Sequence, residues 1–212
     1  SYAGKRAVVV GCYSGMGEAT ARLVGEMGAE VVAVDIREPE IPHSDFLEID
    51  CRDPGSIDSG IDTIVSQGPI DALFYCAGLP GGSFSNADVM SVNFLGQRRF
   101  IERCAGHMEQ GSAIASISSG AGMAYMMALD RVKEFLAIED YATALEWVSH
   151  EDEAGRIEGY SFSKMCTIVY VLNRGPVLTR ETGIRLNCIS PGPTDTPMMP
   201  HFEKQVGKEF MD

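Results

Sequence analysis

The sequence lacks the residue clusters that build metal centres and disulfide frameworks. Its six cysteines include no C-x-x-C pair, and its four histidines are isolated from one another. Zinc sites need clustered ligands and small disulfide scaffolds need closely spaced cysteines, so we expect neither. Scattered thiols are typical of a reducing compartment, and we predict a cytoplasmic protein that holds no metal.

Basic residues and long apolar runs are also scarce. Lys and Arg total 17 against 30 Asp and Glu, which gives a formal net charge of −13. Affinity for nucleic acid comes mostly from clustered cations, so this balance argues against a nucleic-acid partner. No apolar run approaches the roughly 20 residues that span a bilayer, and we expect no membrane partner. The 212 residues, 45% of them hydrophobic, suit one core, so we predict a single domain over 1–212.

The sequence does contain a regular alternation of short apolar segments and amphipathic ones. Strands are expected over 6–10, 30–34, 46–49, 70–75, 113–117 and 184–189, and helices over 16–27, 57–65, 86–104 and 160–180. Continuous apolar strands that alternate with helices are typical of a parallel sheet covered on both faces. With right-handed crossovers, the pattern predicts an α/β fold: a Rossmann-type, doubly wound parallel sheet in three layers.

A glycine-rich turn joins the first expected strand to the first expected helix. It runs from Gly11 through Ser14, Gly15 and Met16 to Gly17. Glycines let the backbone approach a diphosphate closely, and the free N–H groups at the start of a helix attract its negative charge. A glycine turn can serve packing alone, but its place between a strand and a helix favours dinucleotide binding.

The end of the second expected strand bears on the choice of cofactor. Asp35 closes this strand, 18 residues after Gly17, and Ile36 follows it. A carboxylate here can accept hydrogen bonds from the adenosine ribose hydroxyls and would repel a 2′-phosphate. Arg37 favours the opposite preference, because its cation could meet a 2′-phosphate. Since Asp35 lies nearer the strand end, we expect NAD, with NADP as the less favoured cofactor.

A tyrosine and a lysine share one face of the last expected helix. Tyr160 and Lys164 are spaced i, i+4. A nearby cation favours the phenolate and lowers the pKa of tyrosine from about 10, so the pair is a candidate proton donor and acceptor for a carbonyl/alcohol couple. Ser119, with Ser118 as the alternative, follows the fifth expected strand, at the edge where doubly wound sheets bind ligands. No G-x-S-x-G elbow surrounds Ser119, which argues against nucleophilic catalysis.

These motifs, in this order, resemble those of the short-chain dehydrogenase/reductase family. The spacing Gly11-x-x-x-Gly15-x-Gly17 is similar to the cofactor turn of the family, and Tyr160 and Lys164 to its catalytic pair. The further positions that resemble family motifs are Asp50, Cys76-Ala77-Gly78 (with cysteine in place of asparagine), Asn93, Ser119 and 191–196. The resemblance covers nearly the whole chain and implies the fold of the family, a nicotinamide cofactor and hydride transfer at a carbon that carries oxygen.

The resemblance also implies a role for each residue. Tyr160 would exchange a proton with the substrate oxygen, and Ser119 would orient that oxygen. Lys164 would bind the nicotinamide ribose and lower the tyrosine pKa, and Asn93 would position a relay water. The residues expected to bind the cofactor are Gly11, Ser14, Gly15, Met16, Gly17, Asp35, Ile36, Asp50, Cys51, Cys76, Ala77, Gly78, Tyr160, Lys164, Pro191, Gly192, Thr194 and Thr196. Those expected to bind substrate are Ser119, Met123, Tyr160, Pro193, Met198 and Met199.

A long insertion, about 123–159, separates Ser119 from Tyr160. Apolar residues at helical spacing, with acids between them, predict two short amphipathic helices. The insertion and residues 192–198 resemble the bacterial subgroup of 3α-hydroxysteroid dehydrogenase/carbonyl reductase and coniferyl-alcohol dehydrogenase. The insertion could wall the substrate pocket, change how subunits associate, or be a solvated acidic excursion. The methionines near the site suit an adaptable pocket for a bulky apolar substrate or the plain core.

Taken together, these features predict an NAD(H)-dependent oxidoreductase that acts on a bulky apolar alcohol or ketone, steroid-like or aryl. The alternatives are a broad-specificity carbonyl reductase and a non-catalytic dinucleotide-binding regulator. Because members of the family are usually dimers or tetramers, the resemblance implies a homodimer or homotetramer. The family pattern continues to a seventh strand, so we expect the chain to have further residues beyond Asp212.

Overall fold

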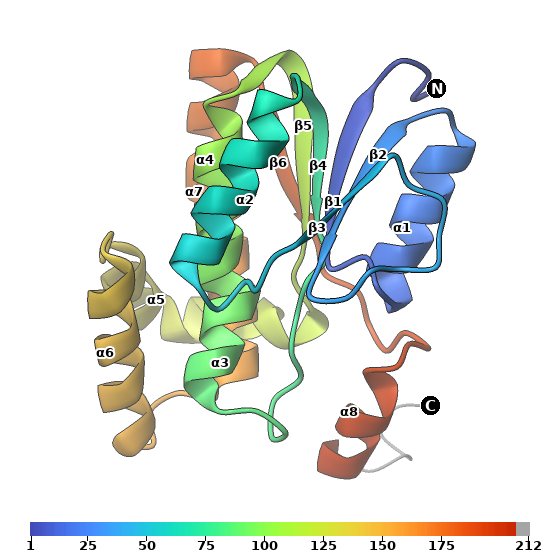
Figure 1. Ribbon diagram of the computed structural model, residues 1–212. Coiled ribbons are helices and arrows are strands. Elements are labelled where there is room, and N and C mark those ends of the chain that lie inside the picture. Colours follow the sequence, from blue (N-terminus) through green and yellow to red (C-terminus); the bar gives the residue numbers. More distant parts are fainter. Residues whose placement is uncertain (207–212) are drawn as a thin grey trace.

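The structure, a computed structural model, describes residues 1–206. Within them, six parallel strands form one sheet in the order β3-β2-β1-β4-β5-β6 (Figure 1). The strands are β1 (Arg6–Val10), β2 (Glu30–Asp35), β3 (Asp45–Glu48), β4 (Ile70–Tyr75), β5 (Met108–Ile117) and β6 (Arg185–Ile189). The strand order reverses between β1 and β4, which is where doubly wound sheets bind their ligands.

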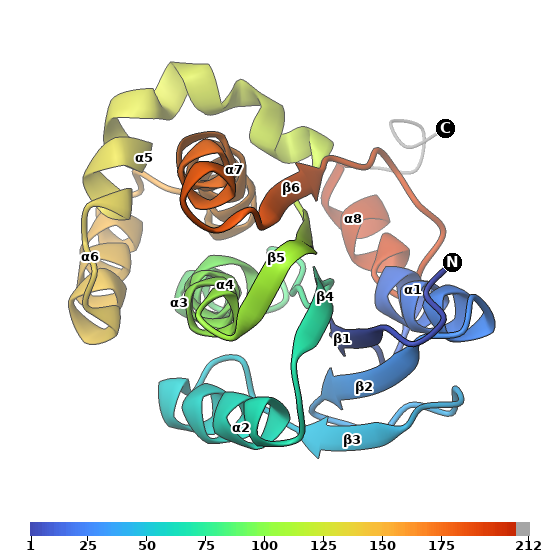
Figure 2. The same cartoon turned by 90° about the horizontal axis from the view of Figure 1, so that it is seen from above.

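Helices cover both faces of the sheet, as Figure 2 shows from above. They are α1 (Gly15–Glu26), α2 (Pro54–Ser66), α3 (Asn86–Met90), α4 (Gln97–Ala105), α5 (Leu129–Leu136), α6 (Tyr141–Glu153), α7 (Gly159–Thr182) and α8 (Met199–Val206), with a π-helical segment η1 (Ser91–Gly96) and a 3₁₀ helix η2 (Gly120–Ala128). Helices α2, α4 and α7 pack on one face and α1 on the other, so the predicted three-layer α/β fold is confirmed.

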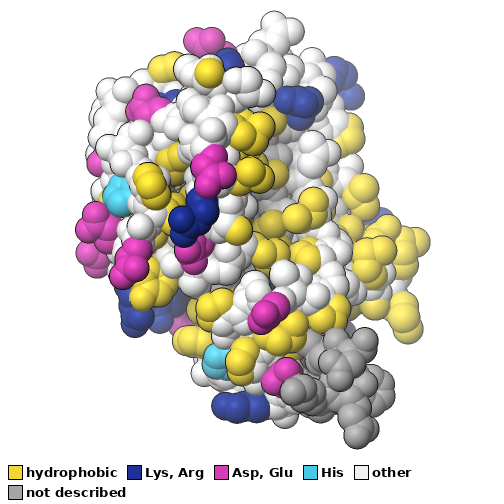
Figure 3. All heavy atoms as spheres, turned by 90° about the vertical axis from the view of Figure 1, so that its right-hand side faces the viewer, with side chains coloured by type: hydrophobic (Ala, Val, Ile, Leu, Met, Phe, Trp, Pro, Cys, Tyr) yellow, Lys and Arg dark blue, Asp and Glu magenta, His cyan; other side chains and the backbone are white. Residues whose placement is uncertain are grey.

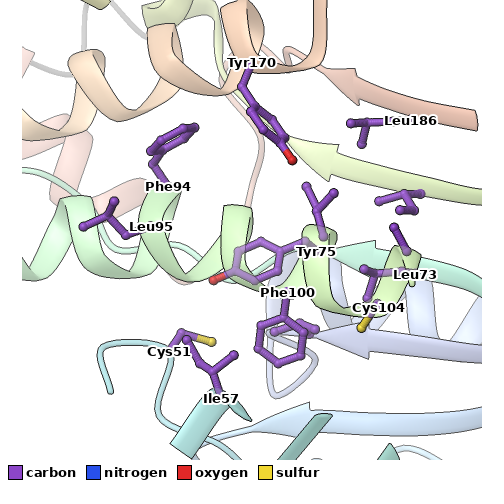
Figure 4. Close-up of a cluster of buried hydrophobic side chains, with 14 of the residues drawn as sticks. Cys51, Ile57, Leu73, Tyr75, Phe94, Leu95, Phe100, Cys104, Tyr170 and Leu186 are labelled. Carbon is purple, nitrogen blue, oxygen red and sulfur yellow. The ribbon is translucent and has the colours of Figure 1, made fainter. Parts of the chain in front are cut away.

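The strands are apolar throughout because both of their faces are buried. In β1, Val8 and Val10 join the core cluster beneath α2, α4 and α7, whereas Ala7 and Val9 join the cluster beneath α1. The larger cluster contains aromatic side chains from the sheet and from α4, with the rings of Tyr75 and Phe100 5.8 Å apart (Figure 4). A continuous apolar run is therefore the expected sequence of a central parallel strand.

The expected helix over 86–104 is interrupted by a π-helical segment. At Gly96 a side chain would have no room, since a Cβ atom there would lie 2.6 Å from the Cys51 carbonyl oxygen. The carbonyl of Val92 turns instead to the Tyr75 hydroxyl, which donates to it at 2.7 Å. Such π-helical insertions are common at functional sites, and this one contains Asn93.

The insertion forms α5 and α6, the two predicted helices, preceded by η2. It is not a solvated excursion, because Val132, Phe135 and Val148 are fully buried. The Phe135 and Trp147 rings each lie 5.6 Å from the ring of Phe162 on α7. The insertion is therefore packed onto the helix that carries the tyrosine–lysine pair.

No helix within residues 1–206 is long and apolar enough to cross a membrane. In the same part of the chain, no group of three or more His, Cys, Asp and Glu side chains is placed to hold a metal ion.

Candidate active site

The glycine turn lies at the carboxyl end of β1, against the segment that follows β4. A Cβ atom on Gly17 would lie 1.9 Å from the Gly11 carbonyl oxygen, and one on Gly11 would lie 2.3 Å from the Ala77 nitrogen. Ser14 caps α1 with its backbone only, and its hydroxyl makes no capping bond. The first N–H groups of α1 have no acceptor within the helix. The turn thus presents bare backbone, donors and a hydroxyl, which suit a diphosphate.

A carboxylate is fixed beside this turn. Asp35 accepts hydrogen bonds from the backbone nitrogens of Tyr13 at 2.9 Å and Ile36 at 2.7 Å. Both bonds hold the carboxylate at the end of β2, next to the turn. The Arg37 guanidinium lies 5.6 Å from the centre of the Tyr13 ring, so the cation predicted to compete with Asp35 packs on this ring.

The expected adenine-side residues follow β3. The Arg52 side chain donates to both oxygens of Asp50, with Nη2 at 2.7 Å from Oδ2, and this ion pair lowers the pKa of the Asp50 carboxyl. The Cys51 thiol is buried in the core, and burial raises its pKa to about 12 (Figure 4). Tyr141, the first residue of α6, donates its hydroxyl to the Arg52 carbonyl at 2.9 Å. This link from the insertion to the segment after β3 is not evident in the sequence.

The segment after β4 is held by Asn93. Its Oδ1 accepts from the Leu79 nitrogen at 2.7 Å, and its Nδ2 donates to the Leu79 carbonyl at 3.0 Å. A Cβ atom on Gly78 would lie 3.6 Å from Asn93 Oδ1 and 3.9 Å from the Lys164 ammonium. The structure therefore brings Asn93, Gly78 and Lys164 together, with the Asn93 amide bound to the Leu79 backbone. The thiol of Cys76, two residues before Gly78, is partly buried, and burial raises its pKa to about 11.

Helix α7 brings Tyr160 and Lys164 to the end of β5. The Lys164 ammonium donates to the Ile117 carbonyl at 2.8 Å and lies 5.6 Å from the centre of the Tyr160 ring. The Ser119 side chain acts to lower the pKa of Tyr160, and its hydroxyl accepts a hydrogen bond from the Ala121 nitrogen at 3.2 Å. The buried Ser118 donates its hydroxyl to the Lys164 carbonyl at 2.9 Å. The geometry thus favours Ser119 over Ser118 as the hydroxyl that meets a substrate.

The expected lowering of the tyrosine pKa is not what this arrangement gives. Burial raises the pKa of Tyr160, the Ser119 side chain offsets part of that change, and the Glu158 carboxylate adds to it. Burial also lowers the pKa of Lys164 from 10.5 to about 8. The Lys164 ammonium donates to the Ile117 carbonyl. Because the pKa of Tyr160 is raised above its ordinary value of 10, its side chain is a neutral phenol at neutral pH.

The segment after β6 crosses the glycine turn. A Cβ atom on Gly15 would lie 3.3 Å from Thr196 Cβ, and a groove of about 610 Å³ runs between α1 and residues 194–197. The backbone of Pro191 accepts from the Gly120 nitrogen at 3.0 Å, which ties the segment to the residue after Ser119. Figure 3 shows the face that carries α1 and α8, where hydrophobic side chains gather. Residues 191–197 therefore lie beside both the turn and the end of β5.

Two methionines predicted to bind substrate, Met198 and Met123, lie on different segments of the chain. Met198 reaches the Gly78 backbone, since its Cε would lie 4.0 Å from a Cβ atom on Gly78. Met123 lies on η2 with 61% of its surface exposed. The site-residue prediction omits Phe202 of α8, whose ring packs edge-on at 5.0 Å from the Tyr160 ring. The only feature of the sequence that indicates a place for Phe202 in the site is its apolar side chain, four residues after Met198.

The chain is similar in sequence to a described family and to named dehydrogenases. The family model described as short chain dehydrogenase matches residues 5–129. The coniferyl-alcohol dehydrogenase of Pseudomonas sp. (strain HR199 / DSM 7063) is 31% identical over 207 residues, which span 97% of this chain and 79% of the relative. The 3-alpha-hydroxysteroid dehydrogenase/carbonyl reductase of Comamonas testosteroni is 30% identical over 209 residues, spanning 95% and 79%.

A solved structure shares the fold. The crystal structure of the 3-alpha-hydroxysteroid dehydrogenase from Pseudomonas sp. B-0831 complexed with NADH superposes with a TM-score of 0.79 at 24% identity, covering 97% of this chain and 80% of that one. The family itself is shown by the family model and by the two relatives above, whose lengths the chain covers by more than two thirds. The chain belongs to the short-chain dehydrogenase family and is an oxidoreductase of that family.

Proposed function

We propose that the protein transfers hydride between NAD(H) and the carbinol or carbonyl carbon of a bulky apolar alcohol or ketone, steroid-like or aryl. The observation that carries this proposal is the placement of Tyr160, Ser119 and Lys164 at the end of β5, beside the glycine turn. A phenol, a hydroxyl and an ammonium that converge next to a dinucleotide turn suit a carbonyl/alcohol couple better than a purely binding site.

The residues at the sheet edge fit a nicotinamide dinucleotide. The bare turn at Gly11–Gly17 and the uncapped Ser14 hydroxyl would hold the diphosphate, and Asp35 the adenosine ribose. The fixed carboxylate of Asp35 supports NAD over NADP, because it would repel a 2′-phosphate. The packing of Arg37 on Tyr13 supports the same preference, since that cation is not directed at the ribose position.

The chemistry of this chain is proton transfer and orientation. The nicotinamide ring supplies the hydride when the cofactor is bound. Ser119 orients the substrate oxygen and polarises it by a hydrogen bond. Tyr160, protonated at neutral pH because burial raises its pKa, donates its proton to that oxygen during ketone reduction. Lys164 keeps its positive charge below about pH 8 and holds it beneath the tyrosine ring.

The apolar surroundings of the tyrosine support a bulky apolar substrate. Phe202 packs against Tyr160, and Met198 lies at the Gly78 backbone. An aromatic ring and a flexible thioether suit flat, hydrophobic substrates. The relatives named for coniferyl alcohol and 3-alpha-hydroxysteroids support the same class. The family commonly forms oligomers, and we propose a homodimer or homotetramer, which light scattering after gel filtration would measure.

A substrate screen tests this proposal. The protein is assayed by NAD⁺ reduction over secondary, steroid and aryl alcohols, with Tyr160→Phe as the matched variant. We expect turnover with bulky apolar alcohols, and at least a 100-fold loss in Tyr160→Phe with unchanged NADH binding. Equal activity of the two proteins would refute the catalytic assignment, and tighter binding of NADPH than of NADH would refute the cofactor assignment.

The screen also distinguishes the proposed enzyme from a broad-specificity carbonyl reductase. The name of the Comamonas relative includes carbonyl reductase, which favours this alternative. Similar kcat/KM values across unrelated aldehydes, quinones and ketones would indicate broad specificity. A preference of 100-fold or more for one apolar class would indicate a dedicated substrate.

A further inference from the structure

Asn86, the first residue of α3, joins the insertion to the start of the helix that carries Tyr160. Its Oδ1 accepts a hydrogen bond from the Gly159 nitrogen at 2.8 Å. Its Nδ2 donates to Asp152 Oδ1 at 2.7 Å. Gly159 directly precedes Tyr160, and Asp152 lies in the last turn of α6. One side-chain amide therefore links α3, α6 and α7 beside the proposed proton donor.

Glycine at position 159 is needed for this link. A Cβ atom there would lie 2.5 Å from Asn86 Oδ1 and 3.0 Å from Asn86 Cα. Gly159 is not among the glycines with positive φ, so its role is close approach and not an unusual backbone conformation. The missing side chain lets α3 press against the first turn of α7.

The first turn of α7 is held almost entirely by side chains. The first N–H groups of any helix lack acceptors within the helix. Here Asn86 accepts from Gly159, while the Glu158 carboxylate accepts from the nitrogens of Tyr160 at 3.1 Å and Ser161 at 2.7 Å. The next nitrogen, that of Phe162, bonds to the Glu158 carbonyl at 2.9 Å. Each of the four nitrogens therefore has a defined acceptor, and Asn86 supplies the one that comes from another helix.

Asp152 fixes which way the amide points. The Gly159 N–H requires the oxygen of Asn86, and the Asp152 carboxylate requires its NH₂ group, so both partners favour the same orientation. The bond to Asp152 is charge-assisted and therefore stronger than one between neutral groups. The insertion is thereby linked to the first turn of α7.

We propose that Asn86 is a positioning residue for Tyr160, and that the insertion braces it through Asp152. The inference rests on the proposed function, in which Tyr160 transfers the proton. A displacement of about 1 Å in a catalytic group can lower a rate by about 100-fold, so small shifts of the first turn of α7 matter.

Single substitutions measure the effect on turnover. Asn86→Ala removes both bonds, and we expect kcat to fall by about 10- to 100-fold while the Kd for NADH stays within about twofold. Asp152→Ala removes only the brace and should lower kcat a few-fold. Glu153→Ala is the matched control, since Glu153 is the exposed acid next to Asp152 and its side chain makes no hydrogen bond or ion pair among the described residues. A kcat for Asn86→Ala within twofold of the parent would overturn the proposal.

A double variant that exchanges the residues at positions 86 and 152 controls for misfolding of the single variants. Asn86→Asp alone keeps an acceptor for Gly159 but sets two carboxylates against each other, and kcat should fall. Asn86→Asp combined with Asp152→Asn restores a donor and an acceptor in reversed places, so kcat should return to within about threefold of the parent. A double variant no more active than Asn86→Asp, at equal thermal stability, contradicts the positioning role.

Hydrogen exchange separates this inference from the proposed function. In Asn86→Ala we expect amide exchange at 159–161 to accelerate at least tenfold, with exchange in α4 unchanged. This readout needs no substrate, so it stands even if the parent turns over no alcohol, a result that would instead refute the proposed function. Unchanged exchange at 159–161 would overturn the proposed role of Asn86.

Discussion

Replacement of Lys164 by methionine is expected to stabilise the fold while it abolishes turnover. Lys164 is 4% exposed, and within residues 1–206 its ammonium has one hydrogen-bond partner, the Ile117 carbonyl at 2.8 Å. Burial of the charge lowers the lysine pKa from 10.5 to about 8. Methionine is similar in length and carries no charge, so Lys164→Met removes the desolvation penalty and keeps most of the packing.

The expected change follows from the pKa. Each pKa unit corresponds to about 1.4 kcal/mol, so the lowering from 10.5 to about 8 means that the buried charge costs about 3 kcal/mol at neutral pH. The variant loses the bond to the Ile117 carbonyl, which is worth about 1 to 2 kcal/mol. We therefore expect Lys164→Met to be about 1 to 2 kcal/mol more stable at pH 7, which corresponds to a Tm about 2 to 8 °C higher.

The pH dependence gives the sharper test. The unfolded chain keeps the Lys164 proton up to about pH 10.5, whereas the folded protein releases it near pH 8. The free-energy cost of burying the lysine charge is therefore fully present below pH 8 and fades as the pH rises to 10.5. Across this window the parent should become more stable relative to the variant. The Cys12 thiol, with a pKa raised to about 12, does not interact with Lys164 and cancels in the difference, whereas the Lys164 charge lowers the pKa values of Cys76 and Cys188, which should therefore rise in the variant.

Urea unfolding of both proteins at pH 7 and pH 9.5 measures the effect. A variant less stable than the parent at pH 7 would refute the argument, as would a stability difference that stays constant with pH. Turnover of NAD⁺ should be undetectable in the variant at either pH, because the cation beneath Tyr160 is gone.

Three further predictions concern the cofactor site and the tyrosine. Gly17→Ala places a Cβ atom 1.9 Å from the Gly11 carbonyl oxygen, so we expect NADH affinity, measured by fluorescence titration, to fall at least tenfold and stability to fall by about 1 to 3 kcal/mol. Tyr141→Phe removes the 2.9 Å bond to the Arg52 carbonyl, and the Kd for NADH by calorimetry should rise about two- to tenfold, with an unchanged Kd arguing that the insertion does not act on the adenine side. Because burial raises the pKa of Tyr160 while Lys164 keeps its charge only below about pH 8, kcat/KM for alcohol oxidation should rise with pH between 6 and 8 while that for ketone reduction does not; an oxidation profile that is flat over this range would show that the phenol ionises more readily than the structure indicates.

Local features of the site could be predicted from the sequence because short-range geometry determines them. The glycine turn, Asp35 at the end of β2 and the i, i+4 pair of Tyr160 and Lys164 depend on the periods of strand and helix. The continuous apolar strands predict a sheet that is buried on both faces, and the structure confirms this arrangement of layers. The limits of β5 were less predictable: the strand begins at Met108 and not at 113, because an irregular register lets Met108 pair with Ile70.

Contacts between distant segments were decided by the tertiary structure alone. The choice of Ser119 over Ser118 depends on which hydroxyl is bound to the α7 backbone, as that of Ser118 is, and the rise of the Tyr160 pKa depends on burial that no local spacing encodes. The bond from Asn86 to Gly159 joins residues 73 positions apart. The sequence by itself determined the fold, the family motifs and the candidate proton donor. The tertiary structure decided how the insertion, α3 and α8 surround that donor, because only packing brings separate amphipathic helices to one point.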